Sequence, residues 1–236
     1  MYRYKLNELK KWKKLETRKP LIIRGARQVG KTWLMKQFGK EEYEKCAYIN
    51  FDANSRMISL FSGDFDIERI IQGLKIESGV NIEPENTLII FDEIQETPKA
   101  LTALKYFYEN ANQYHIIAAG SLLGVAMHEG VSFPVGKVDF LDLYPLNFKE
   151  FLKALGEDDI VNLIEKNDIE LIKVFSDKIK NYLKQYLYIG GMPEVVETYV
   201  KTKDFKEVRN KQEILLAAYE QDFSKHAPNN IVPRIR

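Results

Sequence analysis

The chain has 236 residues, of which 45% are hydrophobic and 29% are charged, and its formal net charge is +1. This length suffices for one large domain and a smaller one, and the composition is typical of a soluble globular protein. The near-neutral charge excludes a strong global attraction to nucleic acid or to an anionic membrane. No apolar run approaches transmembrane length, and the lone Cys46 indicates a buried thiol, so a cytoplasmic protein without membrane contact is expected.

The first predicted element is an N-terminal helix, in which Leu6, Leu9, Trp12 and Leu15 recur every three residues. Its "KKWKK" stretch, residues 10–14, is interpreted as a solvated lysine face. A contact with nucleic acid or a membrane surface is the alternative.

A phosphate-binding loop is predicted between a strand at residues 21–24 and a helix at residues 31–38. The stretch "GARQVGKT" has the spacing Gly-x-x-x-x-Gly-Lys-Thr, which lets backbone N–H groups and a helix N-terminus point at a phosphate. Lys31 is expected to reach the β- and γ-phosphates, and Thr32 to hold Mg²⁺. A chance match to this motif is the alternative. The predicted strand before the loop and the predicted helix after it argue against a chance match. The candidate nucleotide-binding residues are Gly25, Ala26, Arg27, Gln28, Val29, Gly30, Lys31, Thr32 and Trp33.

Strands alternating with helices predict an α/β layered fold with a mainly parallel sheet. The other short apolar runs lie at residues 47–51, 87–91, 115–119 and 138–143, and the helix-like segments between them at residues 67–76, at residues 98–110 and shortly after Ser121. In such sheets, ligands bind at the carboxyl ends of the strands.

The stretch "TLIIFDEIQ" places Asp92 and Glu93 directly after the third predicted strand. Asp92 is predicted to orient Mg²⁺, and Glu93 to polarise the water that attacks the γ-phosphate. A pair of solvated acids at a strand end is the alternative.

The next strand ends in "HIIAAGS", which makes Ser121 a candidate catalytic residue beside Glu93 and Lys31. Its hydroxyl is expected to contact the γ-phosphate or the attacking water, and capping of the following helix is the alternative. His115 begins this strand and is expected to be structural. None of the three histidines has metal-ligand spacing.

Beyond residue 143 the strand signal stops, and helices are predicted to about residue 223. In "PLNFKEFL", Asn147 and Glu150 match the two partners of a capping box, which predicts a helix start. The stretch "YIGGMPE" is the chief interruption among these helices. The sequence therefore predicts a core over residues 1–145 and a helical subdomain over residues 146–236.

On five motifs the chain resembles prokaryotic AAA-type ATPases that pair an ATPase core with a C-terminal domain of unknown function. These motifs are "GARQVGKT", "LIIFDEIQ", "IIAAGSLLG", "LYPLNFKEFL" and "YIGGMPEVV", of which the last three are the more diagnostic. The resemblance implies an additional-strand P-loop core, with a five-stranded parallel sheet of order 5-1-4-3-2, followed by a helical lid. ATP and Mg²⁺ are the ligands it implies.

Two further residue roles follow from the resemblance. In related signal-transduction ATPases, a Gly-x-Pro turn of the lid approaches the adenine and sugar, and the matching positions here are Gly191 and Pro193. A helix-breaking turn between two lid helices is the alternative. Related ATPases often place an arginine before the fifth strand, where this chain has Lys137, which supplies charge without the planar guanidinium fork. Family members usually continue well beyond this chain's last residue, so most of the C-terminal domain is expected to be missing.

The leading functional hypothesis is an ATPase that hydrolyses ATP with Mg²⁺ and moves its lid. A nucleotide-dependent switch with little turnover is the alternative, and the sequence leaves a protein partner and the oligomeric state open. A GTPase is disfavoured because "NKQE", residues 210–213, lacks the aspartate of the guanine signal and lies in a helix-like stretch. Neither a kinase acceptor site nor a nuclease or nucleic-acid recognition element is evident.

Overall fold

The structure is a computed structural model, and it describes residues 1–120 and 136–226. Contacts between Cα atoms divide the chain into two compact units. The sheet unit comprises Tyr4–Ala26 and Gly30–Tyr144, and the helical unit comprises Met1–Arg3, Arg27–Val29 and Pro145–Arg236. Each unit is described by itself.

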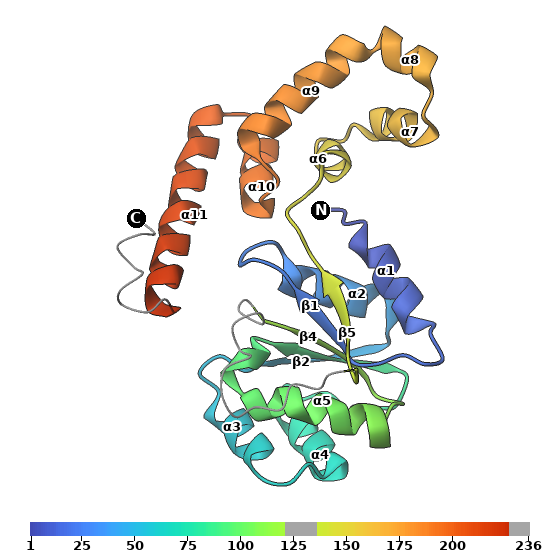
Figure 1. Cartoon of the computed structure of the whole chain (residues 1–236), viewed down its shortest axis with the longest axis vertical. Helices are drawn as coiled ribbons and strands as arrows, with labels where there is room; N and C mark the ends of the chain where they lie inside the picture. Colours follow the sequence, from blue (N-terminus) through green and yellow to red (C-terminus); the bar gives the residue numbers. More distant parts are fainter. Residues whose placement is uncertain (121–135, 227–236) are drawn as a thin grey trace. The chain divides into compact units, whose positions relative to one another are not determined.

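Five parallel strands form the centre of the sheet unit (Figure 1). They are β1 (Leu21–Arg24), β2 (Lys45–Asn50), β3 (Thr87–Asp92), β4 (His115–Ala119) and β5 (Asp139–Asp142). Their order is β2-β3-β4-β1-β5, which is the predicted order 5-1-4-3-2 read from the other edge. The predicted fold class is therefore confirmed.

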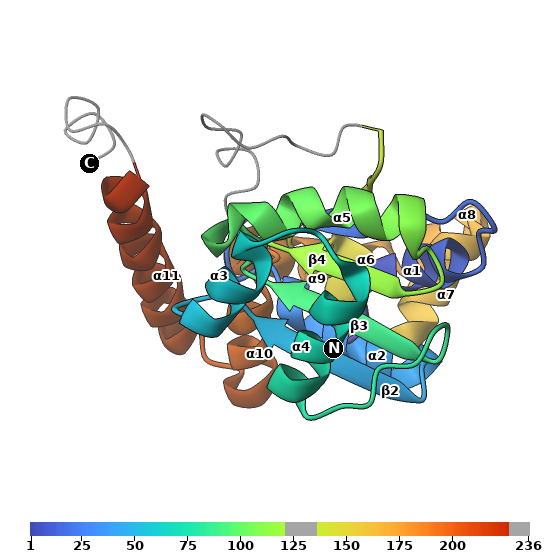
Figure 2. The ribbon, with the colours of Figure 1, turned by 90° about the horizontal axis from the view of Figure 1, so that it is seen from below.

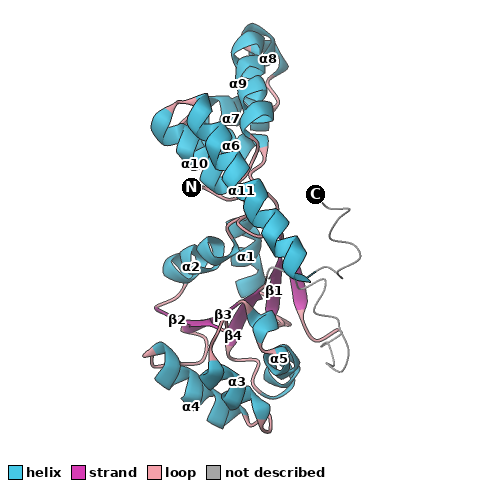
Figure 3. Ribbon diagram, turned by 90° about the vertical axis from the view of Figure 1, so that its left-hand side faces the viewer, coloured by secondary structure: helices cyan, strands magenta, loops and turns pink. Residues whose placement is uncertain are grey.

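Helices cover both faces of this sheet (Figure 3). One face carries α2 (Lys31–Glu42), with α1 (Lys5–Lys13) beside it. The other face carries the remaining helices of the unit, which lie in front of the strands in Figure 2. These are α3 (Ser55–Ser62), α4 (Ile67–Ser78) and α5 (Pro98–Asn110), and the short 3₁₀ helix η1 (Ile94–Glu96) joins β3 to α5.

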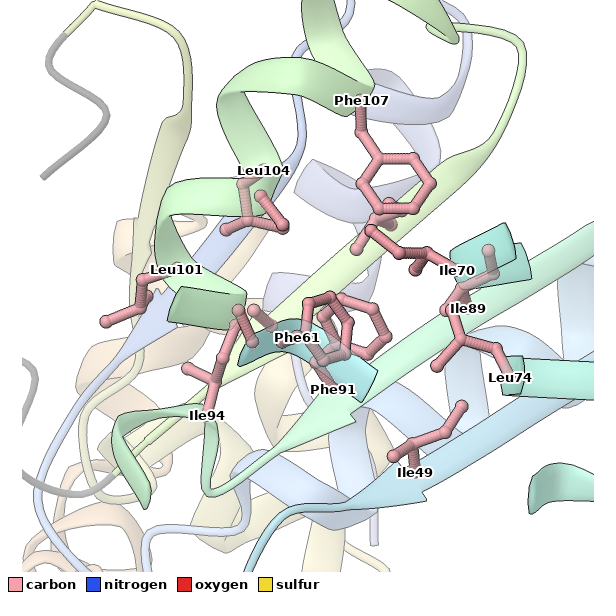
Figure 4. Close-up of a cluster of buried hydrophobic side chains, with 14 of the residues drawn as sticks. Ile49, Phe61, Ile70, Leu74, Ile89, Phe91, Ile94, Leu101, Leu104 and Phe107 are labelled. Carbon is pink, nitrogen blue, oxygen red and sulfur yellow. The ribbon is translucent and has the colours of Figure 1, made fainter. Parts of the chain in front are cut away.

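The main core lies between the sheet and α3, α4 and α5 (Figure 4). Phe91 of β3 packs edge-on against Phe61 of α3, with ring centroids 6.0 Å apart. Every residue of β3 is buried, because helices cover both of its faces. This explains why "TLIIFD" is nearly continuously apolar and ends in a buried aspartate.

Helix α3 was not predicted from the sequence. It has only two turns, and it buries just Met57 and Phe61, one helical turn apart, so its apolar pattern is too short to recognise. The Asn54 side chain caps it by accepting a hydrogen bond from the Met57 amide at 3.2 Å.

The helical unit contains no strand among its described residues. Its helices are α6 (Phe148–Ala154), α7 (Asp158–Lys166), α8 (Ile169–Val174), α9 (Ser176–Ile189), α10 (Pro193–Thr202) and α11 (Phe205–His226). The predicted capping box at the start of α6 is confirmed: Asn147 Oδ1 accepts from the Glu150 amide at 2.9 Å, and Glu150 Oε2 accepts from the Asn147 amide at 3.0 Å. The unit's largest cluster of buried side chains includes Phe151, Val196 and Val208.

Within residues 1–120 and 136–226, no helix combines the length and the apolar character needed to cross a bilayer.

Candidate nucleotide-binding site

The predicted phosphate loop connects β1 to α2, at the carboxyl end of an interior strand of the sheet. Gln28 has φ 62° and Gly30 has φ 93°, so two residues of the loop are in the left-handed region. Gly30, the residue before α2, adopts this conformation without a Cβ clash, whereas for Gln28 it is strained. Left-handed residues in a loop turn successive N–H groups toward one point, as anion-binding loops require.

Lys31 lies folded over its own loop. Its ammonium group donates hydrogen bonds to the carbonyl oxygens of Gly25 at 2.9 Å and Ala26 at 2.8 Å. The residue is buried, which is costly for an ammonium group unless it is hydrogen-bonded. The loop therefore keeps a positive charge where phosphate oxygens would be bound.

The two predicted magnesium residues are in direct contact. The Thr32 hydroxyl donates to Asp92 Oδ2 at 2.7 Å, which joins the start of α2 to the end of β3. No cluster of three or more His, Cys, Asp or Glu side chains that could hold a metal lies in the described part of the chain. One hydroxyl and one carboxylate nevertheless fit magnesium, which keeps several waters and relies on substrate phosphates for other ligands.

Tyr48 is a third member of this group, and no sequence motif predicts its role. Its hydroxyl donates to the same Asp92 Oδ2 at 2.9 Å. Burial, followed by the negative charge of Asp92, raises the pKa of Tyr48, so the hydroxyl remains protonated at neutral pH. The cross-strand register pairs Tyr48 with Ile90, and Asp92 is therefore its diagonal neighbour on the same face of the sheet.

Glu93 follows Asp92 in a strained conformation. Its φ is 52°, unusual for a residue other than glycine, and strain of this kind is concentrated at functional sites. Its side chain is half-buried, and Gln95 Nε2 donates to Glu93 Oε2 at 2.6 Å. Gln95 was not singled out from the sequence, since its role depends on the tight turn of η1.

The remaining candidates are less closely grouped. Trp33 is 39% exposed at the start of α2, and Val29 is fully buried. Ser121 lies outside the described residues. Lys137, discussed as a replacement for an arginine, forms an ion pair with Glu109 at 2.9 Å.

Gly191 and Pro193 lie in the helical unit, at the break between α9 and α10. The Leu146 amide donates to the Gly191 carbonyl at 2.7 Å, and the Tyr186 hydroxyl donates to the Leu146 carbonyl at 2.8 Å. These hydrogen bonds hold the turn against Leu146. The predicted contact of Gly191 and Pro193 with the nucleotide stays a prediction.

Arg3 contacts the middle of the phosphate loop, residues 27–29. Both segments are counted with the helical unit. Arg3 Nη1 donates to the Val29 carbonyl at 3.0 Å, and Arg3 Nε lies 3.3 Å from Glu150 Oε1. Both side chains of the ion pair are 4% exposed. Burial lowers the pKa of Arg3, and the Glu150 charge opposes this shift. The hydrogen bond from Arg3 to the Val29 carbonyl links this buried ion pair to the loop backbone.

The parallel sheet, the glycine loop at the start of α2 and the carboxylate at the end of β3 define a P-loop NTPase. The chain belongs to the AAA domain family, whose model matches residues 17–152. A second model, described as a domain of unknown function, matches residues 180–236.

The chain is also similar to two curated proteins and to a solved structure. The chain is 26% identical to the uncharacterized protein MJ1637 of Methanocaldococcus jannaschii over 81% of its own length and 40% of that protein. It is 27% identical to the uncharacterized protein MJ1544 of the same organism, over 92% of its own length and 45% of that protein. It therefore spans less than half the length of these relatives. A solved structure, the Walker-type ATPase PABY2304 of Pyrococcus abyssi, shares the fold, with a TM-score of 0.58, 15% identity, and coverage of 94% of this chain and 73% of that one.

Proposed function

We propose that this chain binds ATP with Mg²⁺ and hydrolyses it to ADP and phosphate. One observation carries the proposal: the Thr32 hydroxyl contacts Asp92 at the carboxyl edge of the sheet, and the neighbouring Lys31, in the first turn of α2, is folded over the loop. The loop amides and Lys31 would bind the phosphates. Thr32 and Asp92 would hold magnesium, which would offset the phosphate charge as the γ-phosphoryl group is transferred.

Glu93 is the proposed general base. As a water oxygen bonds to the γ-phosphorus, Glu93 takes one proton from that water, and the bond from the γ-phosphorus to the β,γ-bridging oxygen breaks. Its half-buried position next to Asp92 supports this role. Backbone strain at Glu93 supports it too, because such strain is concentrated at functional sites.

Single-turnover hydrolysis of ATP by Glu93→Gln tests the proposal. The amide keeps the side chain's shape but cannot accept the proton, so the rate is expected to fall by about 10²- to 10⁴-fold with ATP affinity nearly unchanged. Glu96→Gln is the matched control, since Glu96 is an exposed acid three residues further on. Hydrolysis by Glu93→Gln at the wild-type rate would contradict the assignment.

A nucleotide-dependent switch with little turnover is the second candidate, and one contact favours it. Gln95 occupies one Glu93 oxygen at 2.6 Å, which restrains the proposed base and would slow proton transfer. Steady-state phosphate release separates the two candidates, because a switch releases little phosphate in the wild-type chain. If the Gln95 restraint limits turnover, Gln95→Ala raises the rate of phosphate release. In either case the helical unit would serve as the lid. A protein partner is compatible with both candidates.

A further inference from the structure

Asp92 holds two hydroxyl donors on a single oxygen atom. Thr32 Oγ1 lies 2.7 Å and the Tyr48 hydroxyl 2.9 Å from Asp92 Oδ2. A carboxylate oxygen offers about two lone-pair directions to donors, so these two bonds saturate Oδ2. Within the described residues, Oδ1 accepts no side-chain hydrogen bond, so it is the oxygen available to a magnesium ion or to a water that the ion carries.

The Tyr48 ring is held in place from α2. Lys36 Nζ lies 3.7 Å from the centroid of the Tyr48 ring, a cation–π contact across the strand surface. Lys36 is one helical turn from Thr32, so the helix that supplies one donor to Asp92 also orients the other. The two donors thus approach Oδ2 from two elements, α2 and β2.

Tyr48 also lines a polar groove at the end of β2. The groove has a volume of about 440 Å³ and is lined by Tyr48, Asn50, Asn54, Arg56 and Glu77 among others. If the phenol hydroxyl were removed, a water entering from this groove would have to replace it as the donor to Oδ2. A mobile water is a poorer restraint on a carboxylate than a hydroxyl on a held ring.

We propose that Tyr48 is a positioning residue of the magnesium site, which acts by fixing the Asp92 carboxylate. This inference rests on the proposed function, since it assigns Asp92 to magnesium. Partners that orient a ligating side chain typically change metal affinity by about 10- to 100-fold when they are removed. The contacts of Tyr48 are with Asp92 and Lys36. Removal of its hydroxyl should therefore weaken magnesium binding and leave the metal-free affinity for the nucleotide unchanged.

The test compares the affinity for a fluorescent ATP analogue with excess Mg²⁺ and with EDTA, in the wild-type chain and in Tyr48→Phe. The ratio of the two affinities measures the metal's contribution to binding. We expect Tyr48→Phe to lower this ratio about ten-fold, while the affinity in EDTA stays within about two-fold of wild type. Tyr43→Phe is the matched control, because it removes a hydroxyl bonded to His115 Nδ1 at 2.7 Å instead.

An unchanged ratio in Tyr48→Phe would overturn the inference. Equal losses with Mg²⁺ and EDTA, or the same fall in Tyr43→Phe, would also overturn it, because the hydroxyl would then serve general stability. A wild-type chain that binds no nucleotide, or binds it equally with and without Mg²⁺, would contradict the proposed function itself. That result is distinguishable, since it appears before any variant is made.

Discussion

Backbone strain marks two residues of the candidate site. Gln28 in the phosphate loop and Glu93 after β3 both have left-handed conformations, which cost about 1–3 kcal/mol each for residues other than glycine. Such conformations persist only where surrounding contacts fix them. Contacts near these residues include the Val29 carbonyl bond to Arg3 and the Glu93 bond to Gln95.

His115 is the clearest pH-sensitive residue of the fold. It is buried, Tyr43 lies 2.7 Å from its Nδ1, and Trp12 packs edge-on against its ring. Burial, aided by the positive charges of Arg18 and Lys13, lowers the pKa of His115 to about 4. The imidazole is therefore neutral in the folded chain at neutral pH, as expected for a structural histidine.

We predict that His115 makes the fold less stable in mild acid. Between its unfolded pKa of about 6.5 and its folded pKa, only the unfolded chain binds the proton, so stability falls as pH falls through this window. The loss between about pH 7.5 and about pH 5 is about 2 kcal/mol. Urea unfolding at both pH values measures it. His115→Gln, which does not titrate, should show a smaller loss, and an imidazole that titrates near its ordinary pKa by NMR would contradict the prediction.

The residues of the candidate site differ in how far the sequence could predict them. The loop residues and Asp92 follow from short motifs whose spacing reflects local geometry. Tyr48 could not be found in this way, because its contact with Asp92 depends on the register between β2 and β3, which are 44 residues apart at these positions. Arg3 is similar, since its partners Val29 and Glu150 are distant in sequence and no local pattern marks a buried arginine.

Among the elements, the strands were predicted best. The predicted strands at residues 21–24 and 115–119 coincide with β1 and β4, and β2, β3 and β5 differ from prediction by one or two residues at their ends. Buried parallel strands are continuous apolar runs, which are easy to recognise. Helices α2 and α4 run past their predicted ends by four and two residues, respectively, because helix ends depend on capping and on tertiary contacts.

The turn between α9 and α10 gives a prediction at this scale. A Cβ added to Gly191 would lie 2.2 Å from the Leu146 carbonyl oxygen and 3.0 Å from its nitrogen, so backbone must shift. We expect Gly191→Ala to destabilise the helical unit by about 1–3 kcal/mol, measured by chemical unfolding. Gly156→Ala is the control, since Gly156 has φ 82° but no atom within 4 Å of an added Cβ. Its expected cost comes from the left-handed backbone alone, about 1–3 kcal/mol, so it measures strain without the clash that is expected at Gly191.

This variant also separates the two interpretations of Gly191. A packed turn predicts lower stability with little direct effect on ATP affinity. Weaker ATP binding without any loss of stability would contradict the packing account and favour the nucleotide contact.

At the scale of the whole molecule, the chain divides into a sheet unit and a helical unit, and the resemblance implies that the second is a lid. A ligand can shift a lid only through differential contact with its states. We therefore predict that an ATP analogue with Mg²⁺ slows hydrogen exchange of residues 182–196 in the wild-type chain. Pro193→Ala, which frees the fixed φ at the start of α10, should reduce this protection. Identical exchange with and without saturating nucleotide would contradict the lid role.

The central claim is that the loop and Lys31 bind the phosphates of ATP. Isothermal titration of Mg²⁺ and ATP into the wild-type chain, Lys31→Ala and Lys40→Ala tests it most directly. Loss of a charge-assisted contact costs about 1.5–3 kcal/mol, so Lys31→Ala should bind roughly ten- to a hundred-fold more weakly. Lys40→Ala removes an exposed lysine from the same helix and should bind like wild type. Equal ATP affinity in Lys31→Ala and wild type would contradict the account.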